Sequence, residues 1–108
     1  MKDQHTKIKG YRDLSQEEVD LMNRIKVAGA VLLDLQVEVA SRLRTDEELK
    51  KVAAAASKAA PEHESSDESV ELRRFMAAEP HRWAAISKTD LQTGLMALVR
   101  AVAQPAGY

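Results

Sequence analysis

The feature that most constrains this fold is a run of apolar residues spaced alternately by four and three positions. Its members are Leu21, Ile25, Ala28, Leu32, Leu35 and Val39. This spacing places them along one side of an α-helix and is the pattern by which helices pack against each other. A second run with the same spacing predicts another packed helix near the end of the chain, at Leu91, Leu95, Leu98 and Val102.

The boundaries of these two helices can be predicted from capping residues. The hydroxyl of Ser15 can accept a hydrogen bond from the backbone of Glu18, and the Glu18 carboxylate can reach back to the Ser15 backbone, which is a capping box. We therefore expect a short N-terminal arm over 1–14 and a first long helix over 15–44. The last helix is expected over 81–104.

The connection between the long helices, residues 45–80, is expected to contain short helices and an acidic loop. Thr45 and Glu48 have the spacing of a second capping box. The Ala-rich stretch that follows them is either a separate helix or a bent extension of the first. An acidic, Ser-rich segment over 61–69 predicts a loop, and a short helix is expected at about 68–78.

The first helix is apolar on more than one side. The run of apolar residues spaced by four and three forms the predicted packing face, or seam, of this helix. Residues that lie off this seam are apolar too, namely Val27, Ala30, Val31, Leu33 and Val37. A helix of this kind is normally buried on several sides, and one partner helix cannot cover them all. We therefore expect an all-α protein with a single helical hairpin domain over 1–108. Its two long helices are expected to run antiparallel, and the hairpin to self-associate into a homo-oligomer.

Composition excludes several functional classes. The 108 residues carry a formal net charge of -1, which disfavours a DNA-binding surface. There is no cysteine, and the three histidines lie far apart, so we expect neither a metal site nor a cofactor. The sequence contains no phosphate-binding loop and no catalytic motif, so an enzyme is not expected. Charges interrupt every window long enough to span a membrane, and we expect a cytoplasmic protein without membrane partners.

Two groups of residues have the chemistry of a nucleotide-binding site. In the arm, Tyr11 offers an aromatic face, and Lys26 on the first helix offers a cation for phosphate. The alternative is that Tyr11 packs as a lid on the helix while the lysines are solvated. In the last helix, Arg82 and Thr89 are seven residues apart and share a face. The alternative there is a surface arginine and threonine, with Trp83 as a packing anchor.

Two long stretches of the chain resemble a known family. One is HTKIKGYRDLSQEE, at residues 5–18, which continues through LMNRIK at 21–26; the other joins RW at 82–83 to TDLQTGLMALVRAV at 89–102. Together they resemble the phage anti-CBASS sponges, which sequester cyclic oligonucleotide signals of bacterial antiviral defence. A related hairpin occurs in phage anti-Thoeris sponges. The connection fits the resemblance less well, because it looks longer and more acidic.

The resemblance implies a function and a set of ligand contacts. It implies a homohexamer acting as a phage counter-defence protein in the cytoplasm of the infected bacterium, without breaking any bond in its ligands. Cyclic dinucleotides such as cyclic GMP-AMP would contact Tyr11 and Lys26 between protomers. Cyclic trinucleotides would contact Arg82 and Thr89 where three protomers meet. Two other hypotheses stay open: a helical oligomeric adaptor that binds a host protein, and a nuclease that cleaves the same signals.

Overall fold

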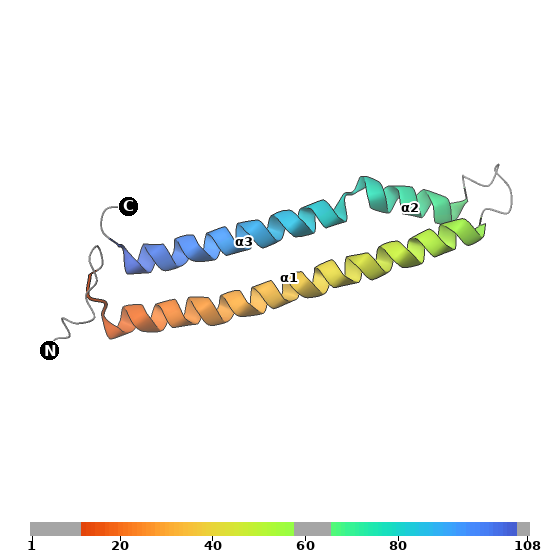
Figure 1. The fold of residues 1–108 in the computed structure, drawn as a ribbon. Helices are drawn as coiled ribbons and strands as arrows, with labels where there is room; N and C mark the ends of the chain where they lie inside the picture. Colours follow the sequence, from red (N-terminus) through yellow and green to blue (C-terminus); the bar gives the residue numbers. More distant parts are fainter. Residues whose placement is uncertain (1–11, 58–65, 106–108) are drawn as a thin grey trace. The chain divides into compact units, whose positions relative to one another are not determined.

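The computed structural model describes residues 12–57 and 66–105 and is all-helical over them. Three helices follow in order: α1 (Gln16–Ser57), α2 (Asp67–Ala77) and α3 (Pro80–Ala103) (Figure 1). The expected all-α class is confirmed for these residues. They form two compact units, which are treated separately below. The first unit contains the described residues up to Leu33 and from Thr89 onward, and the second contains Asp34–Lys88.

The start of α1 has the capping box that the sequence predicts. The backbone amide of Glu18 donates to the Ser15 hydroxyl at 3.1 Å, and the Ser15 amide donates to Glu18 Oε1 at 2.9 Å. The amide of Val19 also donates to the carbonyl of Ser15, at 3.0 Å. Two of the amide groups that a helix start leaves without partners are thereby satisfied.

The prediction that the first helix ends near residue 44 is wrong, because α1 continues to Ser57. Thr45 does not cap a new helix; its hydroxyl donates to the carbonyl of Ser41, 3.4 Å away, as happens inside a helix. An ion pair with (i, i+4) spacing bridges this point, Arg42 to Asp46 at 3.6 Å. Such pairs favour a continuous helix, so the Ala-rich stretch is an extension of α1.

In the first unit, α1 and α3 run antiparallel. Arg12, just before α1, reaches the carbonyl of Ala103 at the end of α3, and Gly29 packs against Leu95 further along both helices. On α3, the predicted seam residues Leu91, Leu95 and Val102 are half-buried, as is Val99. Leu98 is the exception and remains 52% exposed.

The seam predicted for α1 is displaced in this unit. The more buried residues are Met22, Ile25, Gly29 and Leu33, whereas the predicted members Leu21 and Leu32 are each 44% exposed. Only Ile25 belongs to both sets. The bare backbone of α1 at Gly29 lets Leu95 of α3 pack tightly against it, and this contact favours the face that is turned inward. The predicted seam residues Leu21 and Leu32 are left on the outside.

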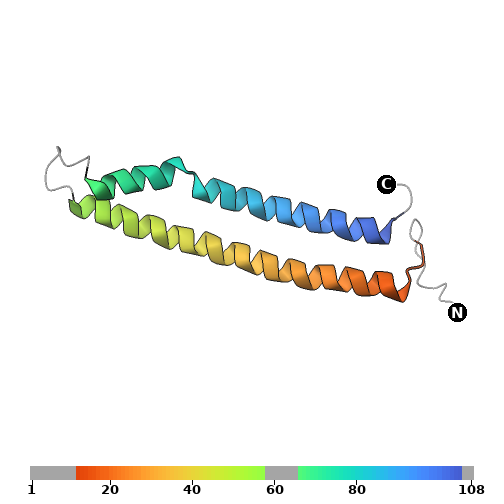
Figure 2. The ribbon, with the colours of Figure 1, turned by 180° about the vertical axis from the view of Figure 1, so that it is seen from behind.

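In the second unit, polar contacts join the remainder of α1 to α2 and to the first turns of α3. The side-chain amide of Gln36 donates to the carbonyl of Ala84 at 2.9 Å, and Lys50 pairs with Glu71 at 3.0 Å. Figure 2 shows α2 beside the last turns of α1. Phe75 of α2 is buried at 6% exposure, and its ring meets the ring of His81 edge to face, with 6.1 Å between ring centres.

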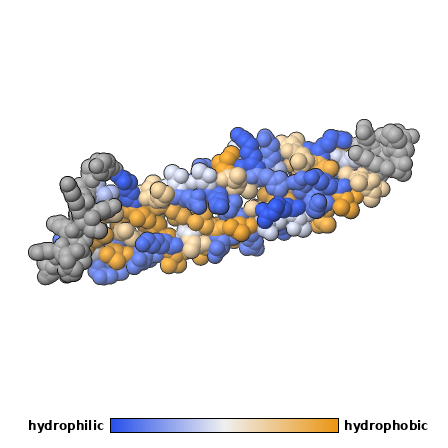
Figure 3. All heavy atoms as spheres, viewed as in Figure 1, coloured by the Kyte–Doolittle hydropathy of each residue, from blue (hydrophilic) through white to orange (hydrophobic). Residues whose placement is uncertain are grey.

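Many large apolar side chains are exposed over the described residues. Figure 3 shows hydrophobic residues scattered among hydrophilic ones on one face of the molecule. In α1 the exposed set is Leu21, Val27, Val31, Leu32, Leu35, Val37, Val39, Leu49 and Val52. Several exposed apolar side chains on one helix can form a surface for association with another protein. None of the described helices is long and apolar enough to cross a membrane.

Candidate functional site

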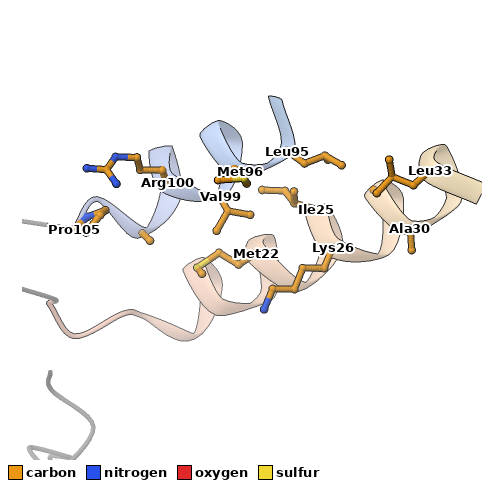
Figure 4. A pocket seen from close by; sticks show the side chains of 12 residues that line it. Met22, Ile25, Lys26, Ala30, Leu33, Leu95, Met96, Val99, Arg100 and Pro105 are labelled. Atoms are coloured by element: carbon orange, nitrogen blue, oxygen red, sulfur yellow. The ribbon is translucent and has the colours of Figure 1, made fainter. Parts of the chain in front are cut away.

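An apolar groove lies between α1 and α3 in the first unit (Figure 4). Its volume is about 640 Å³, and we refer to it as the α1–α3 groove. Residues from α1, α3 and the segment after α3 line it: Met22, Ile25, Lys26, Gly29, Ala30, Leu33, Leu95, Met96, Val99, Arg100, Ala103 and Pro105. Methionine and aliphatic side chains form its floor, a surface that can accept the flat faces of nucleobases or another apolar group.

Two cations, Lys26 and Arg100, border this apolar floor. Figure 4 shows the Lys26 ammonium on the α1 side and the Arg100 guanidinium on the α3 side. Both side chains are exposed, and neither forms an ion pair with any residue that the structure describes. Their charges are therefore available to an anion that enters the groove. The combination suits a ligand that has apolar faces and a negatively charged backbone.

Gly29 lines the groove at a point where α3 packs tightly against α1. A Cβ atom on Gly29 would lie 2.7 Å from Leu95 Cδ1 and 3.0 Å from Leu95 Cδ2. The missing side chain lets Leu95 pack directly on the backbone of α1. The spacing of the two helices at this point is therefore set by the absence of a single methyl group.

Arg12 fixes the other end of the groove. Its guanidinium makes two contacts with the Glu18 carboxylate, Nη2 to Oε2 at 2.6 Å and Nη1 to Oε1 at 3.3 Å. The same group donates to two carbonyls at the end of α3, from Nη2 to Val102 at 2.9 Å and from Nε to Ala103 at 3.2 Å. We call this set of contacts the Arg12 joint. It connects the end of the arm, the first turn of α1 and the last turn of α3.

The charges in the Arg12 joint reinforce each other. Hydrogen bonds from Arg12 and from the Ser15 backbone lower the pKa of Glu18 from its ordinary value of 4.5 to about 2. A guanidinium beside the last carbonyls of α3 also lies at the negative end of that helix dipole. Glu18 in turn lies in the first turn of α1, at the positive end of its dipole. Both side chains therefore occupy the helix end that favours their charge.

The structure places the other predicted residues as follows. Tyr11 lies outside the described residues, while Lys26 borders the α1–α3 groove. Arg82 is exposed on the first turns of α3, with its guanidinium carbon 5.2 Å from the centre of the Trp83 ring. Thr89 is exposed further along α3 and belongs to the first unit, whereas Arg82 belongs to the second.

A second, smaller groove in the second unit is more polar. It has a volume of about 380 Å³ and is lined by Gln36, Val37, Ala40, Arg44, His81, Ala84, Ala85 and Lys88. His81 Nε2 lies 2.5 Å from Glu47 Oε1, within hydrogen-bond distance. The Glu47 carboxylate also forms an ion pair with Lys51 at 2.7 Å. Two hydrogen bonds lower the pKa of Glu47. The one from Lys51 has the larger effect, and the one with His81 has the smaller. No group of three potential metal ligands occurs among the described residues.

Comparison with known proteins identifies the family. Residues 3–103 match the family described as "Acb2/Tad1, hairpin domain". The chain belongs to this family. It is also similar to a protein of Pseudomonas phage JBD67 named "Anti-CBASS protein 2", with 68% identity over 107 residues that cover 99% of each chain. The resemblance seen in the sequence is thereby confirmed.

The phage relative aligns over 99% of both chains, so it has a connection of similar length. Two residues could not be assigned a role from the sequence: Arg12, which joins the two helix ends, and Arg100, which is a second cation beside the groove. Arg100 directly follows the apolar residue Val99 on the last helix. A cation next to the apolar run of that helix is the signal in the sequence that could have indicated its place beside the groove.

Proposed function

We propose that this protein is a phage counter-defence protein that binds cyclic di- and trinucleotide immune signals and sequesters them without cleavage. It would act in the cytoplasm of the infected bacterium and block activation of CBASS effectors. Family membership and the name of the phage relative support the counter-defence role. The observation that carries the binding role is the α1–α3 groove, with its apolar floor between Lys26 and Arg100.

In this proposal the α1–α3 groove is the cyclic dinucleotide site. Lys26 binds a phosphodiester as a compact positive charge, and Tyr11 stacks on a base. Two protomers related by symmetry supply each group twice, which matches a ring of two phosphates and two bases. The exposed apolar side chains of α1 are the surface through which protomers assemble, as a homohexamer.

Arg82 and Thr89 are the proposed contacts for cyclic trinucleotides. The guanidinium of Arg82 lies over the Trp83 ring, and cation–π contact restricts its position. Arginine so held can still donate hydrogen bonds in its own plane to phosphate oxygens. Arg82→Ala should abolish cyclic trinucleotide binding in calorimetry while leaving cyclic dinucleotide binding intact. Retained trinucleotide binding by this variant would exclude Arg82 from the site.

One experiment separates the proposed function from its two alternatives. The protein is incubated with cyclic GMP-AMP, free ligand is measured, and the protein is then denatured and the released nucleotide analysed by chromatography. A sponge depletes the free ligand and returns it intact. A nuclease returns cleaved product, and an adaptor for a host protein leaves the free ligand concentration unchanged; either result would overturn the proposal.

A further inference from the structure

The α1–α3 groove is held at two points of quite different chemistry. At Gly29 the helices touch through Leu95 and a bare backbone, an apolar contact that leaves no room for a Cβ atom. At the other end the helices are joined by the Arg12 joint rather than by apolar packing. Lys26 and Arg100 lie along the groove between these points. The separation of these two cations therefore depends on both contacts.

The Glu18 side of the joint is itself held in place. Glu18 Oε1 accepts from the Ser15 amide while its own amide donates to the Ser15 hydroxyl, so the carboxylate that receives Arg12 is part of the α1 cap. The Arg12 side is held by the carbonyls of Val102 and Ala103 at the end of α3. One guanidinium thus meets three groups that belong to two helices, which the single ammonium of a lysine cannot reproduce.

We propose that Arg12 is a positioning residue for cyclic dinucleotide binding, which sets the α3 side of the groove, with Arg100, against the α1 side, with Lys26. This inference rests on the proposed function. Arg12 directs its donors to Glu18 and to the end of α3, so it acts through other residues rather than on the ligand. Its contribution is preorganisation, which lowers the entropy lost when ligand binds.

The second unit provides a matched control for the ion pair itself. Arg74 contacts the Glu71 carboxylate with both Nε and Nη2, at 2.8 and 2.6 Å, and holds the pKa of Glu71 at about 2. Arg74→Ala therefore removes a pair of the same kind without altering the groove. Arg12→Lys keeps the charge but loses the simultaneous contacts to both helices.

The test is calorimetric titration of the full-length chain with cyclic GMP-AMP, after thermal melts confirm that each variant is folded. Arg12→Ala should weaken binding by about tenfold or more, since misplaced contacts forfeit preorganisation, and Arg12→Lys should recover only part of the loss. Arg74→Ala should bind within about twofold of the parent chain, as expected for a remote surface change. Unchanged binding by folded Arg12→Ala would overturn the inference.

A double-mutant cycle with Lys26→Ala distinguishes positioning from direct contact. If Arg12 acts by holding the groove around Lys26, its loss should cost much less once Lys26 is already absent. Fully additive losses would show an independent contact with the ligand and would overturn the positioning role. If Arg12→Ala fails to fold, Glu18→Gln tests the same joint from the other side and should also weaken binding. Failure of the parent chain to bind would instead reject the proposed function, a distinct outcome.

Discussion

At the scale of single residues, the Arg12 joint and the groove cations show how charge is used in this protein. Charges at the joint are paired with each other and with helix ends, whereas Lys26 and Arg100 have no ion-pair partner among the described residues. Pairing stabilises a particular geometry, and unpaired charge remains available to a ligand. The structural role of the paired charges and the ligand-binding role proposed for the unpaired ones can be tested separately.

The first prediction concerns the acid sensitivity conferred by Glu18. Its pKa is lowered in the folded state from 4.5 to about 2, so its contribution to stability is complete above pH 4.5 and is lost as the pH falls toward 2. Glu18→Gln removes this dependence. In acid titrations followed by circular dichroism, the parent chain should lose stability relative to the variant over that interval. Parallel acid-unfolding curves would contradict the lowered pKa.

The second prediction concerns Lys26. Lys26→Ala should weaken cyclic dinucleotide binding by about a hundredfold, because a charge-assisted contact is lost from each of two protomers. Arg24→Ala is the matched control, since Arg24 is exposed two residues earlier on α1 and does not line the groove. Calorimetry should show a large loss for the first variant and almost none for the second. Equal effects would indicate a general electrostatic attraction instead of a contact.

At the scale of helices, local signals in the sequence predicted where α1 begins, but they did not predict where it ends or which of its faces packs against α3. The start of α1 could be predicted because Ser15 and Glu18 cap each other within one turn. The end of α1 could not, because Thr45 and Glu48 have the same spacing inside a continuous helix. The inward face was also missed, since it is decided by the approach of α3 to Gly29, a contact distant in sequence. Of the candidate site, Lys26 followed from the family resemblance, whereas Arg12 and Arg100 required the paired helices.

The third prediction compares two helical glycines. A Cβ on Gly94 would have nothing within 4 Å, so Gly94→Ala should stabilise the protein by about 0.5–1 kcal/mol through helix propensity. Gly29→Val adds a branched side chain where Leu95 already lies within contact, and overpacking should cost about 1–3 kcal/mol. Thermal melts should therefore shift in opposite directions. A stabilised Gly29→Val variant would contradict the close helix approach.

At the scale of the whole molecule, many apolar side chains of the described residues are exposed to solvent. Nine large apolar residues of α1 are exposed, whereas Met22, Ile25 and Leu33 are half-buried on the side that faces α3. Leaving such side chains in water forfeits about 1.5–3 kcal/mol for each one that could be buried. Association between protomers would recover this free energy, which is the physical argument for the proposed homohexamer.

The fourth prediction tests association through Val31, which is 61% exposed on α1. In an isolated protomer Val31→Glu should change stability by no more than about 0.5 kcal/mol, because surface substitutions are usually mild. In an assembly that buries this residue, the introduced carboxylate should dissociate the protomers. Light scattering should show a hexamer for the parent chain and a smaller species for the variant. Glu38→Gln, at another exposed position of α1, should leave the hexamer intact.

The pairing of Arg82 with Trp83 gives the protein an optical reporter of its own. Trp83 is the single tryptophan of the chain, it is 57% exposed, and a guanidinium lies over its ring. Indole fluorescence responds to the charge and solvent beside the ring, so any anion that draws Arg82 away changes the emission at its source. Binding at this position can therefore be followed in solution without attaching a dye. Because nothing else in the chain emits as a tryptophan, the signal comes from one place on α3.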